Sequence, residues 1–294
     1  MTDYVQRFLF DNTDIRGEIC QLESAFQDTF AHQQFPAELI PLFGQFLAGA
    51  TLLSEVLKFE GILTLQAQGD GDVALIMAEA NHSGHVRGIV RMNPELEGQS
   101  PTLNNTDLPH LLGKAVLTIT IDPDKGQRYQ GVVGIDHDTL AQCLEEYFTQ
   151  SEQLPTHIQL FADDTHCGGL FLQNLPAQLV TDAEQRRDQW ETNVQLAKTV
   201  KTDELFGLTS EVLLTRLFHE MQCRAFTEKE IRFHCTCTRE RSASALQSLG
   251  YDDAMALLQE RDIINIDCQF CGKTYAFGEK ALEELFNDND GAVH

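Results

Sequence analysis

Four cysteines near the C-terminus constrain this chain more than any other feature of its sequence. They form two close pairs, Cys235-Thr-Cys237 and Cys268-Gln-Phe-Cys271, which are separated by 30 intervening residues. Two such pairs can bring four thiolates to one tetrahedral point, which is the geometry that Zn²⁺ prefers. The pattern therefore predicts one zinc ion per chain, bound by Cys235, Cys237, Cys268 and Cys271.

The same ligand set limits what the metal could do. Four sulfur ligands leave no open position for water, which disfavours a hydrolytic zinc. The zinc deaminase signature is also missing, since Asp267 rather than proline precedes Cys268. His234 adjoins Cys235 and could replace one ligand, but four sulfurs already suffice. The sequence offers no catalytic residue and no organic cofactor site.

A zinc–thiolate centre can be a purely structural site or an oxidant-sensitive switch. The Cys-x-Cys spacing allows only a strained disulfide once the metal leaves. Basic residues near the pairs favour the thiolate, which is the oxidisable form; they are Arg232, Arg239, Arg241 and Lys273. Zinc binding supplies much of the folding energy of such a small unit, so zinc loss should unfold it. From the cysteines alone, both interpretations stay open.

Charge and cysteine usage narrow the class of protein. Residues 1–200 carry 11 basic and 28 acidic side chains within a net charge of −24, and such a surface repels nucleic acid. No window approaches 18 uninterrupted apolar residues, and the N-terminus lacks a signal-peptide pattern. We therefore expect a cytoplasmic protein without a membrane partner. The four single cysteines are expected to be ordinary thiols: Cys20, Cys143, Cys167 and Cys223.

The first part of the chain, residues 1–178, predicts an α+β core domain. Apolar residues recur at helical spacing over 36–58. Two extended apolar runs separated by Gly69-Asp-Gly71 then indicate a hairpin. Further strands are expected over 86–92, 115–121, 129–135, 156–161 and 169–173, with a helix over 139–149. Hairpin-connected strands with helices set apart favour α+β over a βαβ series.

Residues 179–229 predict a helical linker. The helix expected over 182–201 carries only a thin apolar stripe of Trp190, Val194, Ala197 and Val200, and a second helix should follow Ser210. Two ordinary surface helices would fit this pattern. A marginally stable linker that unfolds under stress fits it equally well, because a thin apolar face gives little tertiary stabilisation.

Residues 230–294 predict a small zinc-binding domain. A strand should lead into the first cysteine pair, and helices are expected over 242–249 and 253–261. A strand over 263–266 should lead into the second pair, another should leave it, and a helix over 279–286 should close the domain.

The chain as a whole resembles the bacterial redox-regulated heat-shock chaperones of about 33 kDa. The first pair lies in Cys235-Thr-Cys-Thr-Arg-Glu-Arg241, which is similar to the first metal motif of that family, and the second pair matches as well. In the N-terminal half the similar segments include Gln66–Gly71, Tyr147–Thr156 and Gly168–Gln173. The resemblance thus spans nearly the whole chain.

The resemblance implies an ATP-independent holdase that is inactive when reduced and zinc-bound. Oxidation would form disulfides among the four cysteines, release zinc, and unfold the C-terminal domain and linker. Apolar surface would then bind unfolding client proteins, and the chain would form a homodimer. Two alternatives are a zinc-ribbon interaction module without a redox role and a thiol oxidoreductase that uses Cys268 and Cys271.

Overall fold

The computed structural model describes residues 3–96 and 107–287 of the chain. The chain divides into two compact units, Met1–His234 and Cys235–His294, and each has a hydrophobic core of its own. The residues of the predicted linker belong to the first unit in this structure. Their ability to leave it as a separate segment remains a prediction.

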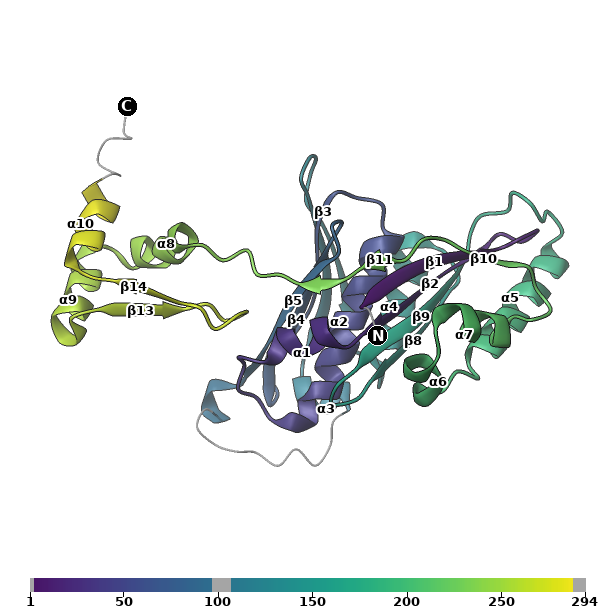
Figure 1. The fold of residues 1–294 in the computed structure, drawn as a ribbon, viewed down its shortest axis with the longest axis horizontal. Coiled ribbons are helices and arrows are strands. Elements are labelled where there is room, and N and C mark those ends of the chain that lie inside the picture. The colour runs from purple at the N-terminus through teal and green to yellow at the C-terminus, as the bar shows by residue number, and fades with distance from the viewer. Residues whose placement is uncertain (1–2, 97–106, 288–294) are drawn as a thin grey trace. The chain divides into compact units, whose positions relative to one another are not determined.

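The first unit contains two sheets, called sheet A and sheet B below (Figure 1). Sheet A has the order β10-β1-β2-β9-β8, with β11 also paired to β1. Its strands are β1 Tyr4–Phe10, β2 Ile15–Leu22, β8 Thr156–Ala162, β9 Cys167–Asn174, β10 Cys223–Ala225 and β11 Lys229–Glu230. Sheet B has the order β12-β5-β4-β3-β6-β7. Its strands are β3 Gly61–Gln68, β4 Val73–Asn81, β5 His85–Met92, β6 Val116–Pro123, β7 Tyr129–Gly134 and β12 Arg232–Phe233.

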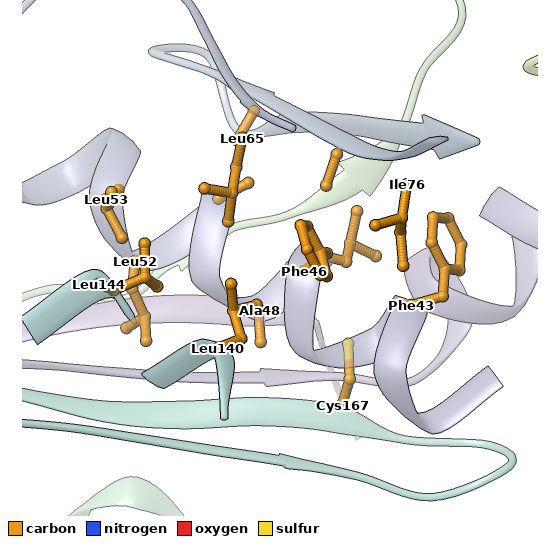
Figure 2. Packing of buried hydrophobic residues seen from close by; sticks show 14 of the residues in the cluster. Phe43, Phe46, Ala48, Leu52, Leu53, Leu65, Ile76, Leu140, Leu144 and Cys167 are labelled. Atoms are coloured by element: carbon orange, nitrogen blue, oxygen red, sulfur yellow. The ribbon is translucent and has the colours of Figure 1, made fainter. Parts of the chain in front are cut away.

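Helix α2, Ile40–Val56, packs against both sheets and forms the centre of the main core (Figure 2). Phe43 and Phe46 on α2 lie near Ile76 of sheet B, and Cys167 of sheet A lies on the opposite side. The stretch Ala37–Val56 is long and apolar enough to cross a membrane by composition, but 78% of its most apolar window is buried inside the unit. Its apolar character therefore reflects a core helix. Shorter helices complete this core: α1 Ser24–Phe30, α3 Leu108–Leu112 and α4 Leu140–Tyr147.

Local sequence explains why sheet B forms as it does. Residues of β3 alternate between buried and partly exposed positions, as a strand with one face on the core requires. Strands β3 and β4 form the antiparallel hairpin expected around Gly69-Asp-Gly71. The α+β class and the strands of this sheet agree with the sequence-based expectation.

Three helices cover the face of sheet A that points away from α2 (Figure 1). They are α5 Ala183–Ala197, α6 Thr202–Gly207 and α7 Ser210–Leu217, called the linker helices below. After α7 the chain runs along the free edge of β1 as β10 and β11, both antiparallel to it. The predicted linker thus covers both a face and an edge of the same sheet.

The second unit is a small α+β domain. It contains α8 Arg239–Leu249, α9 Tyr251–Arg261, β13 Ile264–Asp267, β14 Thr274–Phe277 and α10 Glu279–Asn287. The two strands pair antiparallel, and three side chains of this hairpin, Ile264, Tyr275 and Phe277, pack in the core of the unit. Within its described residues the core has only eight buried apolar side chains, so the unit is a poor candidate for stability without a further constraint.

Candidate metal centre

The two cysteine pairs meet in the second unit. The Sγ atoms of Cys235, Cys237, Cys268 and Cys271 all lie within 4.8 Å of one another. The Cys235 and Cys268 sulfurs are 3.6 Å apart, and the Cys237 and Cys271 sulfurs are 3.5 Å apart. A tetrahedral centre with Zn–S bonds of about 2.3 Å has sulfur–sulfur edges of about 3.8 Å. The donor set and its spacing therefore suit one thiolate-bound metal ion.

The backbone around each pair presents the sulfurs to a common point. At the second pair, the Gly272 amide donates to the Cys268 carbonyl at 2.8 Å, and the Cys268 amide donates to the Lys273 carbonyl at 2.9 Å. Gly272 has a φ of 68°, which a residue with a side chain rarely adopts, so glycine permits this turn. At the first pair, Arg241 donates to the carbonyl and the hydroxyl of Thr236, at 3.3 and 3.0 Å. Arg241 thus holds the residue between the two cysteines.

Tyr275 supports the centre from β14, a role that the sequence analysis missed. Its hydroxyl lies 3.0 Å from the Cys237 carbonyl oxygen and 3.1 Å from the Cys237 sulfur. The alternation in Thr274-Tyr-Ala-Phe277 could have revealed it, because it places Tyr275 and Phe277 on the same inward face of the strand. A hydrogen bond to a metal-binding sulfur orients that ligand and tunes its charge.

The thiols of Cys235, Cys237 and Cys271 differ in how easily each one ionises. Burial raises the pKa of Cys235, and burial with hydrogen bonds among the thiols raises that of Cys271 to about 12. Partial burial opposes ionisation of Cys237, yet hydrogen bonds from Tyr275 and the neighbouring thiols lower its pKa to about 7. The four sulfurs therefore cannot all be thiolates at neutral pH unless a cation balances their charge.

The other residues expected near the pairs are distributed differently. His234 belongs to the first unit, where its ring stacks on His85 at a centroid distance of 4.4 Å, so it is not part of the sulfur cluster. Arg232 also lies in the first unit and pairs with Glu230 at 2.6 Å. Arg239 lies 4.3 Å above the Phe277 ring and so contributes to packing within the second unit.

The four single cysteines lie in the first unit. Cys20, Cys143 and Cys167 are fully buried, and burial raises the pKa of each thiol. Cys223 is half-buried on β10, where burial and the nearby Asp11 carboxylate raise its pKa to about 11. All four thiols are thus disfavoured as thiolates while the unit stays folded.

The linker helices pack on sheet A through a second hydrophobic cluster, called the outer cluster below. The sheet contributes Phe8, Phe10, Ile15, Ile19, Leu170 and Leu172. The linker contributes Ala197, Val200, Leu205, Leu213, Leu214, Leu217 and Phe218 as buried members, with Trp190 partly buried against them. Most of the buried linker side chains come from α6, α7 and the residues just after α7. Helix α5 adds little, as its thin apolar stripe suggested.

One member of the expected stripe lies elsewhere. Val194 is half-buried and is not among the outer-cluster side chains of the described residues. Asn193, on the same face of α5 as Trp190 and Ala197, points inward and is 1% exposed. Its Nδ2 donates to the Gln189 carbonyl at 2.8 Å, while Oδ1 has no hydrogen-bond partner among the described residues. A buried carbonyl without a partner weakens the docking of α5.

Comparison with known proteins identifies the family of this chain. The profile of a family described as Hsp33 protein matches residues 3–278. The 33 kDa chaperonin of Azotobacter vinelandii is 45% identical over 285 residues, covering 97% of this chain and 94% of that protein. The corresponding protein of Shewanella denitrificans is 42% identical over 287 residues, covering 98% and 96%. The chain belongs to the Hsp33 family.

The fold of Hsp33 is present along the whole chain. The crystal structure of a 33 kDa chaperonin from Thermotoga maritima superposes with a TM-score of 0.79, covering 98% of this chain and 99% of that one. At 22% identity this likeness shows the fold alone. Membership of Hsp33 and the four-cysteine cluster together make this chain a redox-regulated holdase chaperone that acts on client proteins, and not an enzyme.

Proposed function

We propose that oxidation of a zinc-bound four-cysteine centre switches this Hsp33 chain from an inactive form to an ATP-independent holdase. The observation that carries this proposal is the convergence of four sulfurs within 4.8 Å in a unit with a small core. A unit of this kind depends on its metal for folding free energy. Chemistry at the sulfurs therefore acts directly on the stability of the unit.

Zinc is the metal that fits this donor set best. Four thiolates without carboxylate or imidazole ligands favour a soft or borderline cation, and a closed tetrahedral site is typical of structural zinc. Cys235, Cys237, Cys268 and Cys271 would hold it, and Tyr275 would fix the orientation of the Cys237 sulfur. We expect one ion per chain in the reduced state.

Oxidation converts the ligands into groups that no longer bind metal. Each disulfide forms when two thiols give two electrons and two protons to the oxidant, and one hydrogen peroxide accepts them as two waters. We expect the pairs Cys235–Cys237 and Cys268–Cys271, because short loops close at the least entropic cost once the unit has unfolded. Oxidation of the first thiolates already removes zinc ligands, so zinc release and unfolding of the second unit precede the completion of these two disulfides.

Loss of the second unit would then release the linker. Helix α5 buries only Ala197 in the outer cluster among its described residues, and beside it lies the unpaired Asn193 side-chain carbonyl, so the docking of α5 is marginal. Release of the linker helices would uncover the apolar face of sheet A that carries Phe8, Phe10 and Leu172. A contiguous apolar surface of this kind binds the exposed apolar segments of unfolding clients. Homodimerisation and a cytoplasmic location complete the proposal.

An aggregation assay tests this function. A client protein is unfolded by heat without ATP, and light scattering is followed with reduced, zinc-loaded chain and with peroxide-treated chain. We expect only the oxidised form to suppress scattering, in proportion to its concentration and without turnover. Equal scattering with both forms would contradict redox activation. Catalytic disulfide exchange on a thiol substrate would favour an oxidoreductase.

A further inference from the structure

The edge of β1 opposite β2 is covered by residues 222–231 of the same chain while the linker is docked. On this edge the Arg7 carbonyl accepts from the Phe226 amide, the Asp3 carbonyl accepts from the Ile231 amide, and the Asp11 amide donates to the Gln222 carbonyl, each at 2.9 Å. Residues 222–231 therefore occupy the full length of β1 on the side away from β2. Uncovered strand edges of this length are templates for pairing with another extended chain.

The segment that covers this edge is a weak occupant. It consists of a three-residue strand and a two-residue strand. Phe8 pairs with Ala225 but Tyr4 pairs with Glu230, so one extra linker residue interrupts the register between them. The interruption leaves Phe226 43% exposed. Because isolated ladders of two or three residues are not stable, this segment depends on the folded elements before and after it.

Charged contacts fix the segment at two points. Arg224 donates to the Asp11 carboxylate at 2.6 Å, and Lys229 pairs with Glu55 on α2. Immediately before Arg224, the segment adds Cys223, opposite Phe10, to the edge of the outer cluster. The edge therefore already holds an extended segment with basic residues five positions apart and a side chain on the apolar face.

We propose that the β1 edge is a client-binding site, occupied after activation by an extended segment of an unfolding protein that pairs antiparallel in place of residues 222–231. The inference rests on the proposed release of the linker. Backbone hydrogen bonding explains how clients without a common sequence are accepted. The carboxylates of Asp11 and Glu55 favour segments that carry Lys or Arg beside apolar residues, in keeping with a chain of net charge −24.

A pair of matched peptides separates edge pairing from contact with the apolar face alone. The parent is a fluorescent ten-residue peptide of alternating apolar residues with lysines five positions apart. The control has the same side chains but carries N-methyl groups on alternate amides, which removes the hydrogen bonds to one edge. We expect the control to bind oxidised chain at least about tenfold more weakly, because several backbone hydrogen bonds are lost. Replacing both lysines by glutamate should also weaken binding.

A disulfide crosslink engineered into the protein tests the same site without changing the peptide. Phe10 and Cys223 form a directly opposed pair between the hydrogen-bonded positions of β1 and β10, a geometry that admits a disulfide. Phe10→Cys should therefore lock β10 onto β1 through the native Cys223, as peptide mapping would verify. The control, Phe10→Cys with Cys223→Ser, has the same truncated side chain without the lock.

The expected outcome is that the locked variant binds the parent peptide at least about tenfold more weakly than its unlocked control, which carries the same loss of the Phe10 ring. Equal binding of the two peptides, or equal binding by lock and control, would overturn the edge site although holdase activity persists. Hydrogen exchange of residues 4–10 should show protection regained only with peptide. Protection without peptide in an oxidised dimer would assign the edge to a second copy of the chain and overturn the proposal. Continued protection of the linker helices after oxidation would instead overturn the proposed function, and the edge site with it.

Discussion

The substitution Ala197→Asp should release the linker without any oxidant. Ala197 is fully buried in the last turn of α5 and packs in the outer cluster against sheet A. A carboxylate at this position would be removed from water among apolar side chains. An uncompensated buried charge costs about 3–5 kcal/mol, which the chain avoids by undocking α5.

The size of this penalty decides the outcome. A penalty of 3–5 kcal/mol shifts an equilibrium by roughly two to three and a half powers of ten. It is comparable to burial of one or two large apolar side chains, at about 1.5–3 kcal/mol each. Among the described residues of α5, only Ala197 is buried in the outer cluster, with Trp190 and Leu196 partly buried against it. Helix α5 should therefore become largely undocked.

Val194→Asp is the matched control on the same helix. Val194 lies three residues before Ala197, is half-buried, and stands outside the outer cluster among the described residues. The two variants have the same charge change and the same new side chain. Because a carboxylate at a half-buried position can still reach water, Val194→Asp should dock as the parent does.

The assay combines client aggregation with zinc content and hydrogen exchange of residues 183–217, all under reducing conditions. Ala197→Asp should suppress aggregation and exchange rapidly over the linker helices while the zinc stays bound. Val194→Asp should match the inactive parent. If Ala197→Asp opens the linker but does not suppress aggregation, uncovering the outer face of sheet A is not the activating event.

Three further predictions concern single features of the structure. Asn193→Leu should strengthen docking by about 1–3 kcal/mol, because it removes a buried carbonyl without a partner, and should slow activation by peroxide. Tyr275→Phe should weaken zinc affinity roughly 10–100-fold in a chelator competition, because the Cys237 sulfur loses its hydrogen bond. Peptide mapping of oxidised chain should find disulfides within each of the two cysteine pairs. Mainly cross-pairs would indicate oxidation inside the folded site, where sulfur–sulfur contacts of 3.5 and 3.6 Å join one pair to the other.

Periodicity in the sequence predicted many of the helices and strands. Apart from the β3–β4 hairpin, it did not predict which strands pair with one another. The helix around 40–56 and the strands of sheet B follow from apolar spacing, and the structure confirms them. Strands β1 and β2 were not anticipated, because both of their faces are covered and their burial pattern does not alternate clearly. Long-range pairing of β10 and β11 with β1 has no local signal at all, since it joins segments more than 200 residues apart.

The residues of the candidate site were likewise predicted only in part from the sequence. The convergence of the four cysteines was predicted from their spacing, since two short motifs nearly determine a tetrahedral site. Tyr275 and Asn193 depend on how a strand and a helix are rotated in the folded units, which a thin apolar pattern does not determine. The sequence analysis placed Val194 on the docking stripe because it is apolar. Residues 193 and 194 both fit the helical spacing of Trp190 and Ala197, and only the rotation of the folded helix buries Asn193.

Hydrogen exchange of the linker helices before and after oxidation tests the central claim most directly. Mass spectrometry would follow peptides covering residues 183–217 in reduced, zinc-loaded chain, in peroxide-treated chain, and after reduction with zinc restored. The account predicts protection in the reduced form, loss of protection together with zinc release, and recovery on reduction. Holdase activity that appears while these peptides remain protected would contradict it.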